Sequence, residues 1–288
     1  MECQVCKSKD FVFFTEKNGF KIVKCKECGL LFVQNVPLDL SSYYSEGYYK
    51  GQANLDGYVD YESDKKVNEV NYKNHLKQIQ RLLNKKNGVF LEIGCATGYF
   101  MELAREEGWS VEGVEISDYA AAVCRKKGLR VIKGIIQDTD VEANLNKFDV
   151  VVLFDVIEHV KNPRTDLDHL WHMIRPGGLM VIATPDAGSF WARLWGKRWH
   201  AIVPPQHLYF FNENNLGQLL IQTGFKKIHA EHSGKYFRLP YVVRMLYSWT
   251  GCRIWSKILA LVNRSAFLSK ITIPINLGDT LFIIARKS

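Results

Sequence analysis

One short run of sequence constrains the fold of this chain more than any other, the segment LEIGCATGYF at residues 91–100. Its apolar start predicts a buried strand, and Gly94 and Gly98 then predict a turn that leads into a helix. Glycine at these positions lets the backbone pass close to a ligand, because no Cβ is in the way. A dinucleotide-binding turn has glycine at its first, third and sixth positions, and only Gly94 meets that pattern. The run therefore predicts another kind of cofactor pocket, in which Glu92 at the strand end faces a cationic group.

A second acidic residue follows at an informative distance. Glu115 lies seventeen positions after Gly98 and ends residues 110–115, which form a second predicted strand. A carboxylate there can accept hydrogen bonds from both ribose hydroxyls of a nucleoside cofactor. Together the two motifs resemble the class I methyltransferases, which use S-adenosylmethionine (SAM), and the resemblance implies SAM as the cofactor. A helix-entry turn without any ligand is the competing interpretation, and the pairing with Glu115 disfavours it.

The resemblance implies a set of cofactor-binding residues. They are Glu92, Gly94, Cys95, Gly98, Tyr99, Phe100, Glu115, Ile116, Ile135, Gln137, Phe154 and Asp155. One departure from the family lies after the third predicted strand, where many relatives have an acidic residue after a glycine. Here Gly134 is followed by Ile135 and Ile136. We therefore expect adenine contacts from backbone amides at this point, with Gln137 or Asp138 assisting.

The chain also carries a cysteine pattern at its start. Cys3 and Cys6 form one Cys-x-x-Cys pair, and Cys25 and Cys28 form a second pair after eighteen intervening residues. This spacing is typical of a four-cysteine zinc ribbon. Because four protein ligands fill a tetrahedral site, we expect a structural zinc ion with no open position for a catalytic water. A ribbon that also binds a substrate or partner, or one that binds iron, stays open as an alternative.

Beyond residue 87, predicted strands and helices alternate, which indicates a parallel sheet covered by helices. The predicted strands are 89–93, 110–115, 129–133, 148–154, 179–183, 225–233 and 280–286. The fold class is therefore α/β, and seven strands in this order match the Rossmann-like methyltransferase sheet, whose last strand is antiparallel.

The expected organisation has three parts. A zinc ribbon occupies residues 1–36, and a linker with N-terminal helices, including a helix within 62–86, occupies residues 37–86. A SAM-dependent methyltransferase domain occupies residues 87–288. Its variable segments are insertions at 187–209 and 235–275.

The fourth predicted strand ends in Asp155 and leads into Val156–Val160, with the sequence VIEHV. This segment resembles the ubiquinone-biosynthesis O-methyltransferases and related enzymes of glycan and natural-product pathways. Enzymes that methylate exocyclic base nitrogens carry an Asn-Pro-Pro-Tyr type motif here, and this chain lacks it. Histidine is the usual general base near neutral pH. We expect His207 to be the base and His159 to support the substrate or cofactor, while a purely structural hydrogen bond at His159 stays open.

The positive charge of the chain is concentrated in one region. The formal net charge is +8, and residues 187–275 alone contain twelve Lys or Arg against two Glu. Such a region suggests an anionic partner. Aromatic residues are interleaved with the cations, with Trp191, Trp195 and Trp199 spaced by four. A lid packed on the domain is the favoured interpretation, and peripheral contact with an anionic membrane through 187–275 is the alternative.

These observations favour a methyltransferase that acts on a hydroxyl, rather than a carbon or nitrogen, of a sugar, a glycan precursor or a related small metabolite. The expected location is cytoplasmic, with contact to the inner membrane face as a variant, because no run reaches the length of a membrane span and the start lacks a signal-peptide pattern. An RNA methyltransferase that grips RNA with its ribbon is one competitor. A non-enzymatic ribbon protein with a SAM-sensing domain is the other.

Overall fold

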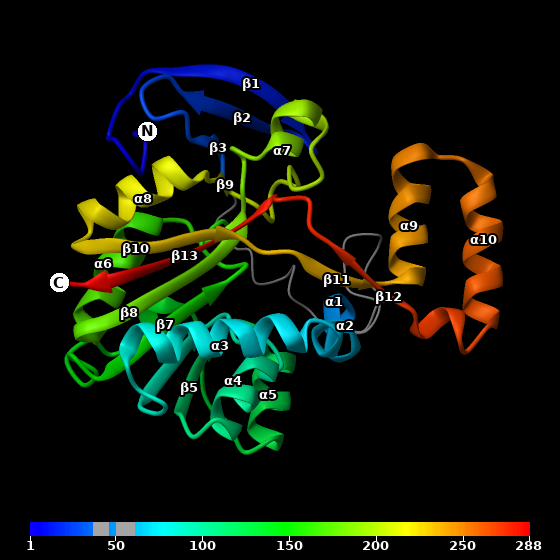
Figure 1. The fold of residues 1–288 in the computed structure, drawn as a ribbon. Helices are drawn as coiled ribbons and strands as arrows, with labels where there is room; N and C mark the ends of the chain where they lie inside the picture. The colour runs from blue at the N-terminus through cyan, green and yellow to red at the C-terminus, as the bar shows by residue number, and fades with distance from the viewer. Residues whose placement is uncertain (37–45, 50–60) are drawn as a thin grey trace.

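The computed structural model describes residues 1–36, 46–49 and 61–288, and its centre is a seven-stranded sheet (Figure 1). The strands, in spatial order, are β10 (Phe225–His232), β13 (Thr280–Lys287), β8 (Ile174–Pro185), β7 (Phe148–Phe154), β4 (Val89–Ile93), β5 (Ser110–Glu115) and β6 (Arg130–Lys133). β13 is antiparallel to both of its neighbours, and the remaining pairs are parallel. The predicted seven-stranded sheet with an antiparallel last strand is confirmed.

Helices cover both faces of this sheet. α6 (Pro163–Met173) and α8 (Glu213–Gln222) lie on one face, and α3 (Glu69–Leu83), α4 (Tyr99–Glu106) and α5 (Asp118–Lys126) lie on the other (Figure 1). Along β7, Val151 and Leu153 pack with α6 and α8, while Val150 and Val152 pack with α3 and α4. Burial on both faces is why the central strands are continuous apolar runs in the sequence.

The fifth strand of the sheet differs from its prediction at its start. β8 begins at Ile174, before the predicted start at residue 179, so the segment Arg175–Gly178 lies inside the strand. The register with β7 nevertheless shifts here, because Phe148 pairs with Ile174 while Val150 pairs with Leu179. The glycines therefore form an irregularity in the strand edge rather than a separate turn.

The helix predicted within 62–86 is two helices, α2 (Tyr61–Val67) and α3, separated at Asn68. The Asn68 side chain explains the break, because its Nδ2 donates to the carbonyl oxygen of Tyr236 at 2.9 Å and its Oδ1 accepts from the Tyr236 N–H at 2.8 Å. The chain leaves α3 at Asn84, whose φ of +52° ends the helix just before the end of the predicted range 62–86. Residues 37–45 and 50–60 of the predicted linker lie outside the described residues, and α1 (Glu46–Tyr49) lies between them.

The N-terminal segment folds as the small sheet expected of a ribbon. Its strands β1 (Phe11–Lys17) and β2 (Phe20–Cys25) are antiparallel, and β3 (Leu31–Val33) pairs with β2. A fourth strand, β9 (Tyr209–Phe210), joins β3 from far along the chain. The ribbon is therefore continuous with the methyltransferase domain.

The last insertion forms a helical hairpin on a two-stranded stalk. The stalk pairs β11 (Lys235–Arg238) with β12 (Thr272–Ile275), and α9 (Leu239–Thr250) and α10 (Arg253–Arg264) extend from it, followed by the short turn η4 (Leu268–Lys270). Figure 1 shows α9 and α10 standing side by side, away from the central sheet. Across the described parts of the chain, no helix has the length and apolar character needed to span a bilayer.

The earlier insertion does not form one continuous helix. α7 (Phe190–Trp195) ends at Gly196, whose φ of +50° and ψ of −122° lie outside the helical region, and the 3₁₀ turn η3 (Gly196–Arg198) follows. Trp199 is 2% exposed, whereas Trp195 is 49% exposed. The three tryptophans spaced by four therefore do not share one helical stripe.

Candidate active site

A cavity of about 930 Å³ opens at the carboxyl ends of the parallel strands. Residues that follow β4, β5, β6 and β7 line one side, and residues of α2, α3, β11 and α9 line another. Open α/β sheets bind their ligands at this end of the strands. The volume lies near the upper end of the ~300–1,000 Å³ of typical ligand pockets, so a cofactor and a second molecule can share it.

The glycine turn after β4 forms part of the cavity wall. The N–H groups of Gly94 and Cys95 donate to the carbonyl oxygen of Val114 at 2.8 and 3.2 Å, which closes the turn onto β5. A Cβ on Gly94 would lie 2.6 Å from Cγ2 of Val156, and the φ of Gly94 is +66°. Only glycine fits here without strain, because both the space and the backbone conformation exclude a side chain.

Glu115, at the end of β5, lies in the cavity wall with its carboxylate oriented by backbone amides. Its Oε2 accepts from the Ala96 N–H at 2.7 Å, and its Oε1 accepts from the Ser117 N–H at 2.8 Å. A carboxylate can accept about four hydrogen bonds, so both oxygens keep capacity for ribose hydroxyls. Burial raises the pKa of Glu115, and the amide hydrogen bonds oppose that shift.

Glu92 lies one strand away, beneath the glycine turn. It is 6% exposed, and its Oε2 has no hydrogen-bond partner among the described residues. Burial raises the pKa of this carboxyl well above its usual value. Because Glu92 does not line the cavity, its contact with the cationic group of SAM stays a prediction. The Glu115 carboxylate in the cavity wall is compatible with the ribose of SAM.

The structure separates the predicted cofactor residues into two groups. Those that line the cavity are Gly94, Glu115, Ile116, Ile135, Gln137, Phe154 and Asp155. Those that do not line it are Glu92, Cys95, Gly98, Tyr99 and Phe100. The second group includes most of the glycine run after Gly94, and contact of these residues with a cofactor stays a prediction.

Packing accounts for the residues placed outside the cavity. Cys95 lies in a core cluster with Met101 and Leu129, and a Cβ on Gly98 would lie 2.4 Å from Leu129. The Tyr99 hydroxyl donates to Glu69 at 2.6 Å. Phe100 is 3% exposed within the core between α4 and the sheet. These four residues position the turn and helix rather than face the cavity.

The segment predicted to contact adenine has hydrogen bonds of its own. The Ile135 N–H donates to Asp138 Oδ2 at 2.8 Å, so this amide is already engaged. Gln137 donates through Nε2 to Asp166, whose pKa is raised to about 7 by burial. Gln137 and Asp166 both line the cavity. Polar contacts to a base would therefore come from this side-chain pair as well as from the backbone.

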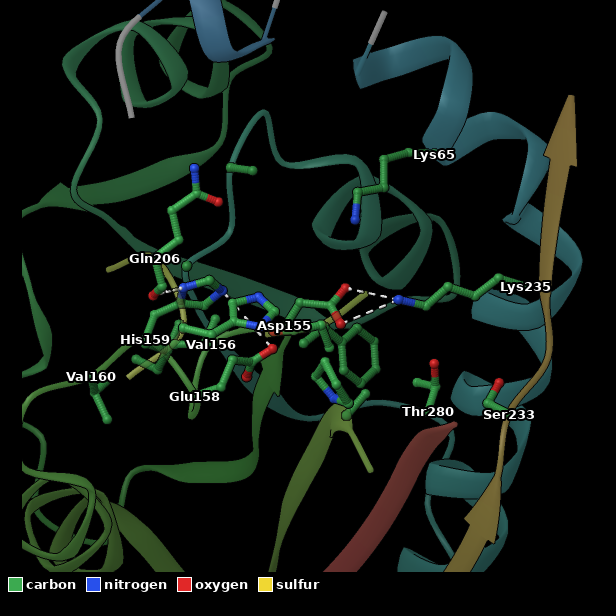
Figure 2. Close-up of a pocket in the computed structure, with 18 of the residues that line it drawn as sticks. Lys65, Asp155, Val156, Glu158, His159, Val160, Gln206, Ser233, Lys235 and Thr280 are labelled. Atoms are coloured by element: carbon green, nitrogen blue, oxygen red, sulfur yellow. Dashed lines mark hydrogen bonds and ion pairs between the residues drawn. The ribbon is translucent and has the colours of Figure 1, made fainter. Parts of the chain in front are cut away.

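Asp155, at the end of β7, forms an ion pair across the cavity. Its Oδ1 and Oδ2 lie 3.3 and 3.4 Å from Nζ of Lys235 on β11 (Figure 2). Burial alone would raise the pKa of Asp155, but the charges of Lys235 and Lys65 lower it below its usual value. The carboxylate is therefore ionised at neutral pH, and it joins the sheet to the stalk of the hairpin.

Two histidines and a glutamate converge beside Asp155, and we call Glu158, His159 and His207 the acceptor cluster. One nitrogen or oxygen atom from each lies within 4.8 Å of the other two. The rings of His159 and His207 meet edge to face with centroids 4.7 Å apart, and His159 Nε2 lies 3.9 Å from Glu158 Oε1. All three residues line the cavity, and Figure 2 shows Glu158 and His159 side by side.

Hydrogen bonds fix the tautomers of the acceptor cluster. Nδ1 of His159 lies 2.7 Å from the carbonyl oxygen of Gln206, and Nδ1 of His207 lies 2.7 Å from that of Ala201. Because a carbonyl can only accept, each Nδ1 carries the proton and each Nε2 keeps its lone pair. Glu158 accepts from the Thr184 hydroxyl at 2.9 Å through Oε2, while its buried Oε1 has no hydrogen-bond partner among the described residues.

Burial sets the protonation of the acceptor cluster. It lowers the pKa of His159 and lowers that of His207 to about 3, so both imidazoles are neutral at pH 7. It raises the pKa of Glu158 to about 8, with the charge of Asp155 acting in the same direction. Two neutral imidazole lone pairs and a buried carboxyl form a donor set that suits a divalent cation. Nδ1–H groups bonded to backbone carbonyls are also typical of metal-binding histidines.

The ribbon holds the loop that carries His207. The N–H of Val33 donates to the carbonyl of Leu208 at 2.9 Å, and the N–H of Leu208 donates to the carbonyl of Glu158 at 2.8 Å. At the tip of the β1–β2 turn, Lys17 donates to the carbonyl of Ile202 at 2.6 Å and Asn18 to that of Pro204 at 2.9 Å. The small sheet therefore continues directly into the acceptor cluster.

The four N-terminal cysteines gather at the other end of the ribbon. Their sulfur atoms all lie within 4.8 Å of one another, with Cys3 and Cys28 at 3.5 Å and Cys6 and Cys25 at 3.4 Å. Zn–S bonds of about 2.3 Å in a tetrahedron place sulfurs about 3.8 Å apart, so the cluster fits Zn²⁺. The hydrogen bond from Cys28 lowers the pKa of Cys3 to about 5, although burial opposes that shift.

Several cavity residues were missed by the sequence reasoning. Tyr49, Lys65, Glu158, Lys235 and Arg238 line the cavity. Only Glu158 carried a local signal, as a carboxylate inside the apolar segment VIEHV after a buried strand. The other four come from segments that are brought to the cavity by tertiary structure alone.

Comparisons with known proteins agree with this geometry. A family described as a methyltransferase domain matches residues 68–230, more than half of the chain. A ubiquinone biosynthesis O-methyltransferase of Maricaulis maris is 29% identical over 41% of this chain and 54% of its own length. A malonyl-[acyl-carrier protein] O-methyltransferase of a Paenibacillus species is 26% identical over 49% of this chain and 56% of its own. The chain thus spans about half the length of these two relatives.

Two further similarities concern an archaeal relative and the fold. An uncharacterised protein of Methanocaldococcus jannaschii is 28% identical over 57% of this chain and 76% of its own length. The crystal structure of a SAM-dependent methyltransferase from Archaeoglobus fulgidus aligns with a TM-score of 0.53 at 21% identity, over 78% of this chain and 97% of that one.

The sheet order, the glycine turn and the acidic residue after β5 define a class I SAM-dependent methyltransferase. This chain belongs to the methyltransferase-domain family whose match covers residues 68–230.

Proposed function

We propose that this methyltransferase moves the methyl group of SAM to a hydroxyl group of a small or sugar-linked acceptor, held at the acceptor cluster. The observation that carries the proposal is the convergence of two neutral imidazole nitrogens and the buried Glu158 carboxyl in one cavity with Glu115. Hydroxyls need activation before they accept a methyl group, and this cluster is the part of the cavity equipped for that task.

The cofactor side needs only binding and orientation. When bound, SAM supplies a methyl group already activated by the sulfonium charge, so the protein must mainly align it with the acceptor. Glu115 accepts the ribose hydroxyls, and Glu92 lies behind the turn, outside the cavity wall. Asp155, ionised through Lys235, lies between the cofactor side and the acceptor cluster and orients groups on both.

The acceptor side deprotonates and positions the hydroxyl. A pKa near 3 leaves His207 neutral but weakly basic, so we replace the expected lone histidine base with the whole cluster as a divalent-cation site. When bound, the cation would lower the pKa of the acceptor hydroxyl. Glu158, His159 and His207 would hold it, while the backbone carbonyls of Gln206 and Ala201 fix the orientation of the two rings.

The chemistry of the acceptor is suggested by the opposite wall of the cavity. Lys235 and Arg238 line it together with Tyr236 and Tyr241, and Lys161 lines the cavity near His159. Cations and aromatic rings suit the phosphates and rings of a nucleotide-linked or lipid-linked sugar. The two O-methyltransferase relatives support oxygen rather than nitrogen or carbon as the accepting atom.

The ribbon is proposed to bind a structural zinc ion through Cys3, Cys6, Cys25 and Cys28. Its closed set of four ligands leaves no position for substrate. Its role in the reaction is to hold the loop of His207, through the hydrogen bonds from Val33 and Lys17.

A paired measurement tests this function. Transfer of labelled methyl from SAM would be measured with nucleotide-linked sugars and catechols, with Mg²⁺ or with chelator. We expect O-methyl ethers among the products, and a loss of about 100-fold or more in His207→Ala and Glu158→Gln. S-adenosylhomocysteine affinity, measured by calorimetry, should stay unchanged in both variants. His172→Ala, an exposed histidine on α6, is the matched control. Products methylated only on nitrogen or carbon would contradict the proposal.

A further inference from the structure

The hairpin, defined as α9 and α10 (residues 239–264), exposes apolar side chains on the face turned away from its own core. Its inner face contains Val243 and Val262, which are 3% and 4% exposed. On the outer face of α10, Ile254 is 57% exposed and Leu261 is 63% exposed. Residues seven apart lie on the same face of a helix, so these two side chains form one apolar stripe. Phe267, just after the hairpin, is 77% exposed and extends the apolar surface.

Cations flank this stripe and acidic residues are absent from the surrounding sequence. Lys257 and Arg264 each lie three residues after an apolar residue of the stripe, so they neighbour it on the helix surface, and both are exposed. Between Glu231 and Asp279 the chain contains seven Lys or Arg and no Asp or Glu. A helix surface that combines exposed aliphatic side chains with unopposed positive charge is typical of helices that lie in the interface of a membrane.

We propose that the hairpin docks on an anionic lipid surface, with Ile254, Leu261 and Phe267 inserted among the acyl chains and the neighbouring cations at the headgroups. Each cation near a negatively charged leaflet adds electrostatic attraction. Aliphatic side chains gain by leaving water for the acyl region. Charge complementarity therefore indicates an anionic lipid surface as the partner. The apolar stripe indicates that the side chains reach below the headgroups into the acyl region.

Two other occupants fit the same surface less well. Nucleic acid binds through cations with aromatic rings that stack on bases, whereas Ile254 and Leu261 are aliphatic and cannot stack. A second copy of the chain packed symmetrically on this face would bring two sets of unopposed cations together, which is unfavourable. An anionic membrane accepts both the charge and the aliphatic side chains.

The stalk connects this surface to the cavity. Lys235, Tyr236, Phe237 and Arg238 of β11 line the cavity, and β11 leads directly into α9. A hairpin docked on a membrane would therefore place the outer wall of the cavity close to the lipid surface. Docking itself does not depend on the proposed reaction, so it can be tested without an acceptor.

The test is sedimentation of the full-length, zinc-loaded protein with vesicles. Vesicles of phosphatidylglycerol mixed with phosphatidylcholine are compared with vesicles of phosphatidylcholine alone, at low and at physiological salt. We expect binding to the anionic vesicles only, weakened as salt screens the charges. The double variants Lys257→Glu/Arg264→Glu and Ile254→Ser/Leu261→Ser should each weaken binding by about tenfold or more.

Matched controls test whether the loss of binding is specific to the hairpin, and not a general result of removing exposed charge or apolar area. Arg125→Glu/Lys126→Glu changes two exposed cations on α5, and Ile221→Ser changes an isoleucine on α8 that is 64% exposed. Both controls should bind as the unchanged protein does, and circular dichroism should show that every variant keeps its helices. Absence of binding to anionic vesicles at low salt would overturn the proposal. Equal weakening of vesicle binding by the hairpin and control variants would also overturn it. So would hairpin variants that change RNA binding or oligomeric state and leave vesicle binding unchanged.

Discussion

The ribbon (residues 1–36) and the hairpin are both additions to the same central sheet, but they are attached in opposite ways. The ribbon is hydrogen-bonded through β3 and β9 to the loop of His207, and its residues Cys3, Val5 and Phe32 join the main hydrophobic core. The hairpin is attached through a two-stranded stalk, and Val243 and Val262 are its only apolar residues that are almost fully buried among those described. The ribbon thus supports the loop of His207 without lining the cavity, whereas the hairpin contributes Tyr241 and Met245 to the cavity wall and exposes its outer face.

Removal of the proposed zinc ion should give the largest difference between the ribbon and the hairpin. Cys25→Ser or a strong chelator should unfold the ribbon, because structural zinc contributes about 10–16 kcal/mol to small metal-dependent folds. Hydrogen exchange should then accelerate at β9 and in the loop of His207, while β13 stays protected. Cys252→Ser is the control, since Cys252 is an exposed cysteine in the turn between α9 and α10. Protection of β9 that survives zinc removal would contradict the coupling of ribbon and site.

Loss of the aromatic contact between the ribbon and the rest of the chain should give the second-largest difference between the two regions. Phe32 is 3% exposed and contacts both Phe11 and Tyr209, with ring centroids 5.1 and 6.3 Å apart. Phe32→Ala should lower the free energy of unfolding by about 3–5 kcal/mol. Phe267→Ala, at the exposed end of the hairpin region, should change it by less than about 0.5 kcal/mol. Urea denaturation of both variants measures the difference, and equal effects would remove the distinction between the two regions.

Substitution of one arginine that anchors the ribbon should give the smallest of the three differences. Arg164 on α6 donates to the carbonyl oxygens of Gln4 at 2.9 Å and Val5 at 2.5 Å. Arg164→Met leaves these acceptors without their charged donor, so we expect a loss of about 1–3 kcal/mol and faster release of zinc to a chelator. Arg253→Met on the hairpin should leave both quantities unchanged. Release of zinc at the same rate from both variants would argue against this anchor.

The sequence predicted those parts of the molecule whose signal is local. The segments Val89–Ile93, Ser110–Glu115 and Phe148–Phe154 are strands with the predicted bounds. The first and the last are apolar runs and were readable because burial of both faces leaves little polar alternation. The paired cysteines were readable for a similar reason, since two short turns fix their spacing.

The parts that were not predicted depend on contacts between distant segments. The break at Asn68 arises from hydrogen bonds to Tyr236, and the ionisation of Asp155 depends on Lys235, eighty positions away. The pairing of β3 with β9 was likewise invisible, because Tyr209–Phe210 is too short to read as a strand. Helix propensity and local pattern carry no information about such partners.

The central proposal is that the acceptor cluster is the reacting end of the SAM cavity. The most direct measurement is a crystal structure with S-adenosylhomocysteine and Mn²⁺, located by anomalous scattering. We predict S-adenosylhomocysteine with its ribose on Glu115 and its sulfur directed toward the cluster, and one Mn²⁺ coordinated by Glu158, His159 and His207. An S-adenosylhomocysteine sulfur directed away from these residues, with no anomalous peak between them, would contradict the account.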